Sequence, residues 1–238
     1  MEILEKNDTQ IIFKSDMGVS LTNAIRRYLV EIPTLAVEEV EISRNDGPLY
    51  DETIAHRIGL IPLIMEKKYK ESDAIKLKLS VKKAGIVYSR ELHGDVSPAY
   101  DGVPITDLRG EQELILTATA KLGKGKDHAK HNPGMMFYRN VSELTADKSF
   151  LSEIKRICPN ANIKEKGDKI VILDDQVEEV LDVCEGLLRK SGSPVETKVH
   201  DELIITIESF GQISPKKIFE KSIETLKKDL VIFAKALK

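Results

Sequence analysis

The chain has 238 residues, of which 41% are hydrophobic; this is enough to build a buried core, so a wholly disordered chain is excluded. Its 36 basic and 39 acidic side chains give a formal net charge of −3, which excludes a global positive field that would gather the chain onto DNA or an anionic membrane. Only two cysteines are present, which excludes a disulfide framework or a four-thiolate zinc site and favours a reducing cytoplasm. We expect neither a signal peptide nor a membrane helix, because no segment approaches the roughly 20 apolar residues that a span needs.

The first forty residues predict two strands followed by a helix. Residues 3–4 and 11–13 are β-favouring runs joined by a turn at residues 7–8. In the helix, Ser20 is the expected cap and Pro33 the end. Its apolar positions at helical spacing are Leu21, Ala24, Ile25, Tyr28, Leu29 and Ile32, and its polar remainder carries Arg26 and Arg27.

The middle of the chain predicts a short helix and antiparallel sheet. The helix covers Asp51 to Gly59, with Asp51 as its cap. Residues 75–81 and 114–120 alternate apolar with polar side chains, which is typical of strands with one face in water. Residues 121–134 follow neither period and predict a loop.

Residues 150–192 predict a small module of helix, strand, turn, strand and helix. Gly167 and Asp168 form the turn, and Gly192 ends the second helix. The apolar stripe of the first helix consists of Phe150, Leu151, Ile154 and Ile157, and that of the second of Val177, Val180, Leu181, Cys184, Leu187 and Leu188.

The end of the chain predicts a strand at residues 203–207 and then a long helix that begins at Ser214 and Pro215. The apolar side chains of this helix alternate spacings of four and three: Phe219, Ile223, Leu226, Leu230, Phe233 and Leu237. Such a seam packs lengthwise on another helix. The pattern leaves open whether that surface belongs to the same chain or to a partner.

Two fragments near residue 125 could carry chemistry. His128 and His131 would share one face of a helix and bind a metal there, but Pro133 and the surrounding glycines favour a loop. Gly123, Gly125 and Lys126 lack the spacing of a phosphate-binding loop. The basic side chains Lys121, Lys124, Lys126 and Lys130 could contact phosphate or an acidic protein surface, or simply be solvated. No nucleophile, acid–base pair or other catalytic motif stands out.

Several segments together resemble the alpha-type subunits of DNA-directed RNA polymerase, in the archaeal and eukaryotic branch that includes the third-largest subunit of RNA polymerase II and is related to the bacterial alpha N-terminal domain. Residues 23–27 (Asn-Ala-Ile-Arg-Arg) with residues 31–40 resemble the first block of this family. Residues 51–63 resemble the second block, residues 123–130 the third, and residues 208–211 the closing part. The blocks follow the family's order over nearly the whole chain.

The resemblance implies an α+β fold in three parts. A discontinuous dimerisation domain comprises residues 1–40 and 195–238, an antiparallel β domain comprises residues 41–142, and residues 143–194 form a ferredoxin-like module. It also implies a non-catalytic role in transcription. In the family this subunit pairs with the smaller subunit L, and with small subunits N and P the pair forms the platform for the two large catalytic subunits.

The resemblance also assigns residues to surfaces. The partner interface comprises Leu21, Ile25, Arg26, Arg27, Leu29, Phe219, Ile223, Leu226, Leu230, Phe233 and Leu237. Other subunits, in particular the second-largest one, would contact Lys124, Lys126, His128 and Lys130. No sequence-specific DNA contact is expected.

Two departures from the family concern residue 131 and the metal. His131 stands where relatives commonly carry Trp. Cys158 and Cys184 match two ligands of the iron–sulfur clusters that some relatives hold in the module, but Glu178 and Leu181 occupy other ligand positions. Because a cubane cluster needs four ligands, we expect no cluster.

We therefore predict a non-catalytic assembly subunit of an archaeal RNA polymerase. The alternatives are a nucleic-acid-binding module that uses Lys121–Lys130, which a salt-dependent gel shift would favour, and a small phosphate-handling enzyme, which would require turnover by the isolated chain.

Overall fold

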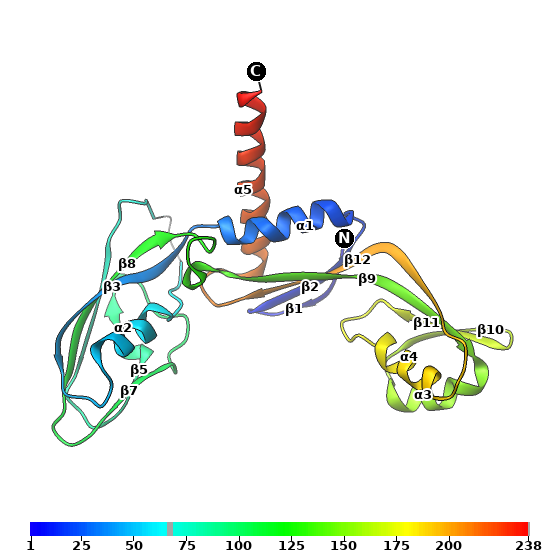
Figure 1. Cartoon of the computed structure of the whole chain (residues 1–238), viewed down its shortest axis with the longest axis horizontal. Coiled ribbons are helices and arrows are strands. Elements are labelled where there is room, and N and C mark those ends of the chain that lie inside the picture. Colours follow the sequence, from blue (N-terminus) through cyan, green and yellow to red (C-terminus); the bar gives the residue numbers. More distant parts are fainter. Residues whose placement is uncertain (66–68, 238) are drawn as a thin grey trace. The chain divides into compact units, whose positions relative to one another are not determined.

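The computed structural model describes residues 1–65 and 69–237, which form two compact units. The first unit combines residues 1–23 with residues 136–207, and the second combines residues 24–135 with residues 208–238. Helices and antiparallel sheets occur in both units (Figure 1), so the predicted α+β class is confirmed.

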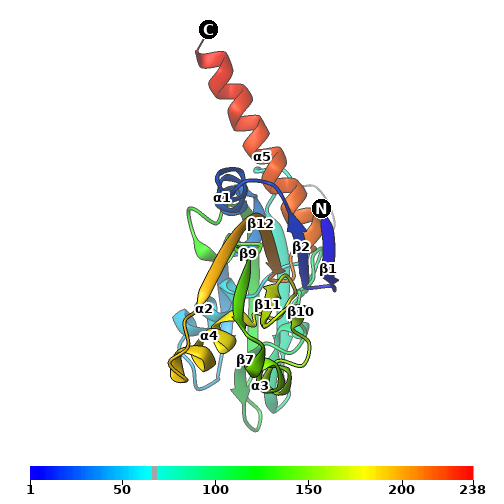
Figure 2. The ribbon, with the colours of Figure 1, turned by 90° about the vertical axis from the view of Figure 1, so that its right-hand side faces the viewer.

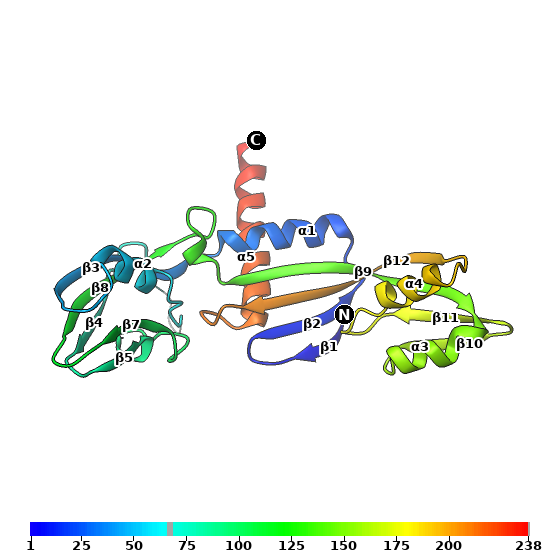
Figure 3. The same cartoon turned by 60° about the horizontal axis from the view of Figure 1, so that its bottom comes forward.

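The first unit contains a six-stranded sheet in the order β1-β2-β12-β9-β11-β10, whose strands lie side by side in Figure 3. Its strands are β1 Glu2–Lys6, β2 Gln10–Ser15, β9 Gly134–Asp147, β10 Asn162–Lys166, β11 Lys169–Asp174 and β12 Glu196–Ser209. The predicted N-terminal strand pair is confirmed, with Ile3 opposite Phe13. The turn at Gly167, where φ is +62°, is also confirmed.

Part of this unit has the ferredoxin-like arrangement that the resemblance implies. Along the chain the order is β9, α3 (Leu151–Ile157), β10, β11, α4 (Leu181–Lys190) and β12, and a short 3-10 turn (Lys148–Phe150) precedes α3. This βαββαβ order with strands arranged β12-β9-β11-β10 defines the motif. Its first and last strands along the chain, β9 and β12, lie partly or wholly outside residues 143–194, and the domain bounds stay a prediction.

The ferredoxin-like part has its own core on one face of the sheet. Ile170 lies opposite Ala146 and Ile172 opposite Leu144, so these four side chains share a face. The two helices cover that face with Ile154, Leu181, Cys184 and Leu188, all of them buried.

The second unit is built around a four-stranded sheet in the order β3-β8-β4-β6 and a two-stranded sheet of β5 and β7. Its strands are β3 Thr34–Asn45, β4 Ile75–Val81, β5 Gly85–Tyr88, β6 His93–Gly94, β7 Pro104–Leu108 and β8 Leu114–Gly123. Its α-helices are α2 Asp51–Gly59, α5 Pro215–Ala236 and the later part of α1 Val19–Tyr28, with 3-10 turns at Leu29–Glu31, Ser89–Glu91 and Ala129–His131.

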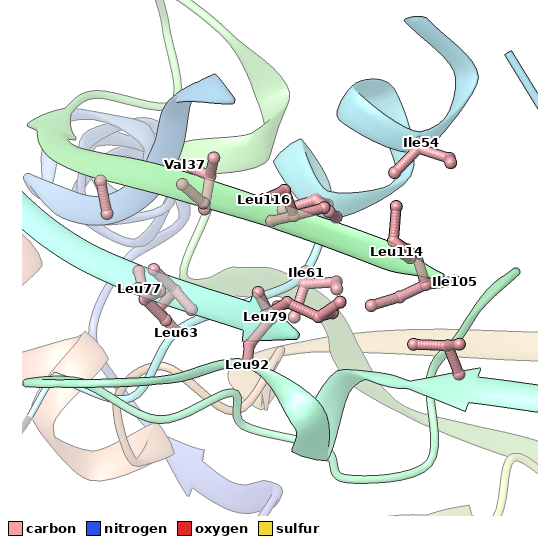
Figure 4. Close-up of a cluster of buried hydrophobic side chains, with 14 of the residues drawn as sticks. Val37, Ile54, Ile61, Leu63, Leu77, Leu79, Leu92, Ile105, Leu114 and Leu116 are labelled. Atoms are coloured by element: carbon pink, nitrogen blue, oxygen red, sulfur yellow. The ribbon is translucent and has the colours of Figure 1, made fainter. Parts of the chain in front are cut away.

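The core of the second unit lies between α2 and the strands (Figure 4). Leu77 and Leu79 of β4 and Leu116 of β8 are almost completely buried, while Lys76 and Lys78 are exposed. The predicted alternation of apolar and polar side chains in β4 and β8 is therefore confirmed. This alternation decides which face of the sheet packs against the core.

Two predicted helix caps are wrong, because each predicted residue lies inside its helix. Helix α1 begins at Val19, so Ser20 lies inside its first turn, where the amide of Thr22 donates to Gly18 O at 3.1 Å. Helix α2 begins at Asp51 as predicted, but Tyr50 is the capping residue, and Asp51 Oδ1 instead accepts a hydrogen bond from Asn45 Nδ2 at 2.7 Å.

The predicted loop at residues 121–134 is partly wrong. Strand β8 continues to Gly123 because its pairing with β3 continues there, with Thr34 opposite Gly123. Strand β9 begins at Gly134 and was missed, because its buried and exposed residues do not alternate over its whole length. The helix expected from Val177 begins only at Leu181, and Asp174 Oδ1 accepts the amide of Val180 just before it.

Candidate functional site

The terminal helix α5 is anchored at its N-terminal end and unpartnered at its C-terminal end. Ser214 precedes Pro215 at the start of the helix, as predicted. Near that end, Ile218 is 0% and Ser222 1% exposed. The N-terminal end of α5 therefore packs on its own chain, which is one of the two possibilities that the seam pattern left open.

The C-terminal half of α5 exposes large apolar side chains. Phe219, Ile223 and Leu226 of the predicted seam are half-buried, but Leu230 is 56%, Phe233 64% and Leu237 73% exposed. Figure 2 shows this half of α5 extending beyond the elements around its start. Within the part of the chain that the structure describes, nothing covers these side chains.

The exposed surface is wider than the predicted seam. Val231 is 53% and Ile232 65% exposed, so residues 230–233 form an apolar run that covers more than one side of the helix. The sequence analysis missed these two residues, although four consecutive apolar residues in a helix are the signal of a surface that is covered on several sides.

The residues assigned to the interface in α1 and in the 3-10 turn that follows it divide into two groups. Ile25 and Leu29 are 2% and 3% exposed, so they belong to the chain's own core and leave almost no area for a partner. Leu21, Arg26 and Arg27 are exposed. None of these observations tests the interface itself, which stays a prediction.

Tyr28 joins the end of α1 to α5. Burial raises the pKa of the Tyr28 hydroxyl, and a hydrogen bond with Asp229 raises it further. Asp229 immediately precedes Leu230, so this contact fixes α5 at the point where its exposed apolar run begins.

The loop Lys121–Lys130 is held by ion pairs. Lys124 Nζ and Lys126 Nζ each lie 3.1 Å from Glu31 Oε2. Burial alone would raise the pKa of Glu31, but the hydrogen bonds from the two lysines outweigh it and lower that pKa. Glu31 is thus a charged anchor for the middle of the loop.

The two ends of the loop are anchored in the same way. Lys121 Nζ lies 2.8 Å from Glu39 Oε1 and Lys130 Nζ lies 2.7 Å from Glu38 Oε2. The hydrogen bond from Lys130 lowers the pKa of Glu38. Lys121 and the three lysines of the third family-like block therefore pair with three glutamates of the first block, and the segment presents less positive charge than its sequence suggests.

His131 closes the loop against β3. Its ring is buried, and burial lowers the pKa of the imidazole although the hydrogen bond to Thr34 O favours the protonated ring. His128 Nδ1 accepts the amide of Lys130 at 3.1 Å. Among the described residues no group of three His, Cys, Asp or Glu side chains could hold a metal ion, so the predicted pair of histidines is not supported as a metal site.

Three family-like blocks meet at one recess of about 340 Å³. Leu60 and Pro62 come from the second block, Lys130 from the third and Phe210 from the closing part, with Tyr100 between them. Leu60, Tyr100 and Phe210 are 50%, 43% and 38% exposed. The remaining lining residues are Ala129, Asn132 and Gln212. The recess is an apolar cup that no single sequence block revealed.

The two cysteines meet in the core of the ferredoxin-like part. Cys184 is 2% exposed and Cys158 packs against the same core. Leu181 fills that core and Glu178 is exposed. Two thiols with an aliphatic side chain at a third ligand position do not fit a four-ligand cubane cluster.

The exposed apolar half of α5, which none of the described residues covers, is a surface of the kind that binds another chain. The profile of the family described as "RNA polymerase Rpb3/Rpb11 dimerisation domain" matches residues 12–230. The chain belongs to this family.

Similar proteins come from archaea. The chain is 34% identical to the DNA-directed RNA polymerase subunit Rpo3 of Pyrococcus furiosus, over 95% of this chain and 92% of the relative. It is 33% identical to subunit Rpo3 of Thermococcus kodakarensis, over 94% and 92%. It is 32% identical to subunit Rpo3 of Methanothermobacter thermautotrophicus, over 94% and 93%. A search of the described helices finds none with the length and hydropathy of a membrane span.

Proposed function

We propose that this chain is the D-type assembly subunit of an archaeal DNA-directed RNA polymerase, with no catalytic residue of its own. It pairs with the smaller subunit L, and the pair carries small subunits N and P and the second-largest catalytic subunit. Polymerase works on the chromosome, so we place the protein in the cytoplasm. The family membership and the archaeal Rpo3 relatives support the assignment.

The observation that carries the proposal is the exposed C-terminal half of α5. Fully burying one Leu or Phe side chain contributes roughly 1.5–3 kcal/mol. Association costs about 4–15 kcal/mol in lost translational and rotational freedom. The three exposed seam residues therefore contribute about 4.5–9 kcal/mol at most, which offsets only the lower part of that cost. We propose that Val231, Ile232 and the exposed Leu21, Arg26 and Arg27 contribute to the same interface.

Copurification tests the pairing. Leu230→Asp would place a carboxylate in the middle of the partner surface, where burying an unpaired charge costs several kcal/mol. Because Leu230 is 56% exposed in this chain, the variant should fold normally, with an unchanged thermal midpoint. We expect it to lose subunit L.

Lys217→Asp is the matched control, since Lys217 is exposed on the same helix but lies in its first turn, away from the apolar run at residues 230–233. This variant should retain subunit L. If Leu230→Asp still pairs at wild-type affinity, the seam is not the partner surface.

We propose that the apolar recess and the Lys121–Lys130 loop bind the other polymerase subunits. Lys124, Lys126 and Lys130 are already paired with glutamates, so their main effect is to hold the loop in shape. The exposed side chains of Leu60 and of the loop residue His128 offer contact surface for another subunit. An apolar side chain of the second-largest subunit or of a small platform subunit fits such a recess better than a charged one.

The ion pairs also weigh against the nucleic-acid alternative. Lysines bind DNA by neutralising its phosphates and releasing the counterions condensed on them, and each lysine of the loop would first have to give up its carboxylate partner. A gel shift of the isolated chain with duplex DNA should therefore show no salt-dependent micromolar binding. Turnover by the isolated chain would instead favour the phosphate-handling alternative.

We propose that the ferredoxin-like part holds no iron–sulfur cluster and that the domains divide at the predicted bounds, 1–40 with 195–238, 41–142 and 143–194. The ligand count supports the first statement, because Cys158 and Cys184 are the only thiols in the chain. Iron and sulfide analysis of the purified protein tests it, and near-stoichiometric iron would contradict it. Limited proteolysis with mass spectrometry tests the bounds.

A further inference from the structure

The two cysteines of the chain are neighbours in the structure although 26 positions separate them in the sequence. Cys158 follows the last residue of α3, where its amide donates to Ile154 O at 2.8 Å. Cys184 lies within α4. Cys158 packs against the buried core that contains Cys184, and a hydrogen bond between the two thiols is one cause of the raised pKa of Cys184. Both cysteines therefore lie in one compact unit and meet at the junction of its two helices.

The two thiols differ in accessibility. Cys158 is half-buried and can meet a small solute, whereas Cys184 is 2% exposed. Burial and the neighbouring Cys158 raise the pKa of Cys184 to about 12. A solvent-borne oxidant reaches Cys158 first because Cys158 is the more exposed thiol. Cys184 packs in the same core and is the other thiol of the chain that can react with the product, and its raised pKa makes that second step the slower one.

We propose that Cys158 and Cys184 form a reversible disulfide that ties the end of α3 to α4. With hydrogen peroxide as the oxidant, the Cys158 sulfur attacks one peroxide oxygen, the O–O bond breaks, and a sulfenic acid and water form. The Cys184 sulfur then attacks the sulfenic sulfur. The S–S bond forms, the S–O bond breaks, and the released hydroxide takes the Cys184 proton and leaves as a second water.

The cross-link has a structural consequence. It closes the segment that contains the β10–β11 hairpin and the start of α4, and constraining such a loop stabilises the folded state mainly through the unfolded chain. A part this small has a limited core of its own, so the effect on it should be large. We expect oxidation to raise the unfolding midpoint of this part by roughly 5–10 °C.

Thiol counting on the full chain tests the proposal. The native protein is treated with hydrogen peroxide, quenched, unfolded and alkylated with iodoacetamide. The expected result is loss of both alkylatable thiols, an intact mass lower by about 2 Da, a monomer on a non-reducing gel, and recovery of both thiols with dithiothreitol.

Cys158→Ser is the matched variant, because it leaves Cys184 buried without a partner. Its thiol should stay alkylatable after the same treatment, and its midpoint should not rise. Sulfinic acid on Cys158 with Cys184 still free, or a disulfide between two chains, would overturn the proposal. The result does not depend on copurification of subunit L, so it can fail while the proposed function holds.

Discussion

His131 and Thr34 hold each other through two hydrogen bonds across 97 positions of sequence. Thr34 Oγ1 donates to His131 O at 2.6 Å, and His131 Nδ1 lies 2.9 Å from Thr34 O. A carbonyl oxygen only accepts, so Nδ1 carries the proton and Nε2 does not. Nε2 faces Gly123, where an added Cβ would lie 2.4 Å away. This contact joins the end of the Lys121–Lys130 loop to the first residue of β3.

The first prediction concerns pH. Burial lowers the pKa of His131 in the folded state, so the unfolded chain takes up a proton first, near pH 6.5. The contribution of His131 to the free energy of unfolding is therefore complete above about pH 7 and declines as the pH falls below about 6.5. Urea midpoints at pH 7.5 and pH 5.5 measure the decline.

His131→Phe should show a smaller decline between these two pH values, although it is less stable at both because the hydrogen bond to Thr34 O is lost. His56→Phe is the control, since the His56 ring is exposed on α2 and is not among the groups that shift the pKa of His131, and it should retain the wild-type decline. An identical decline in His131→Phe would show that another group is responsible.

The second prediction concerns the contact between the ring and the glycine. Gly123→Ala should destabilise the second unit by about 1–3 kcal/mol, because the new methyl group meets the buried ring and the ring is held by Thr34. Gly186→Ala is the control, since its Cβ would meet nothing within 4 Å and Ala favours a helix by about 1 kcal/mol. Urea unfolding measures the stability of both variants. If Gly123→Ala is as stable as Gly186→Ala, the contact between residue 123 and the His131 ring does not constrain the fold.

The third prediction separates the two ends of α5. Ile218→Ala should cost roughly 2–5 kcal/mol in the isolated chain, because Ile218 is 0% exposed. Phe233→Ala should leave the isolated chain unchanged and weaken pairing with subunit L, because Phe233 is 64% exposed. Thermal unfolding and copurification measure the two effects. A loss of stability in Phe233→Ala would mean that the exposed half packs on its own chain.

The fourth prediction concerns the recess. Leu60→Asp should weaken assembly of the complete polymerase while the pair with subunit L survives, because the carboxylate replaces an apolar wall that is half-exposed in this chain. Reconstitution with the remaining subunits measures the effect. The double variant Lys124→Gln with Lys126→Gln should also weaken assembly of the polymerase, since Glu31 loses both ion-pair partners. If all these variants assemble as the wild type does, neither the recess nor the loop is a surface that binds other subunits.

The sequence by itself determined the elements that depend on neighbouring residues. Period-two alternation identifies the buried face of β4 through Leu77 and Leu79, and Ser214 with Pro215 marks the start of α5. Gly167 marks a tight turn, because its positive φ is strained for other residues. These features need only a few consecutive residues, so they are visible without a fold. The family-like sequence blocks also indicated the class of protein, an alpha-type subunit of RNA polymerase.

Only the tertiary structure decided which distant residues meet. The Lys130–Glu38 pair, the Thr34–His131 pair and the neighbouring cysteines join positions from 26 to 97 residues apart. Such contacts depend on strand order, register and helix packing, which no local period encodes. A shift of one residue in β3, for example, would move Thr34 and Glu38 to the other face of the sheet. The basic loop therefore looked like a free cationic surface in the sequence, whereas the fold brings a carboxylate to each of its lysines.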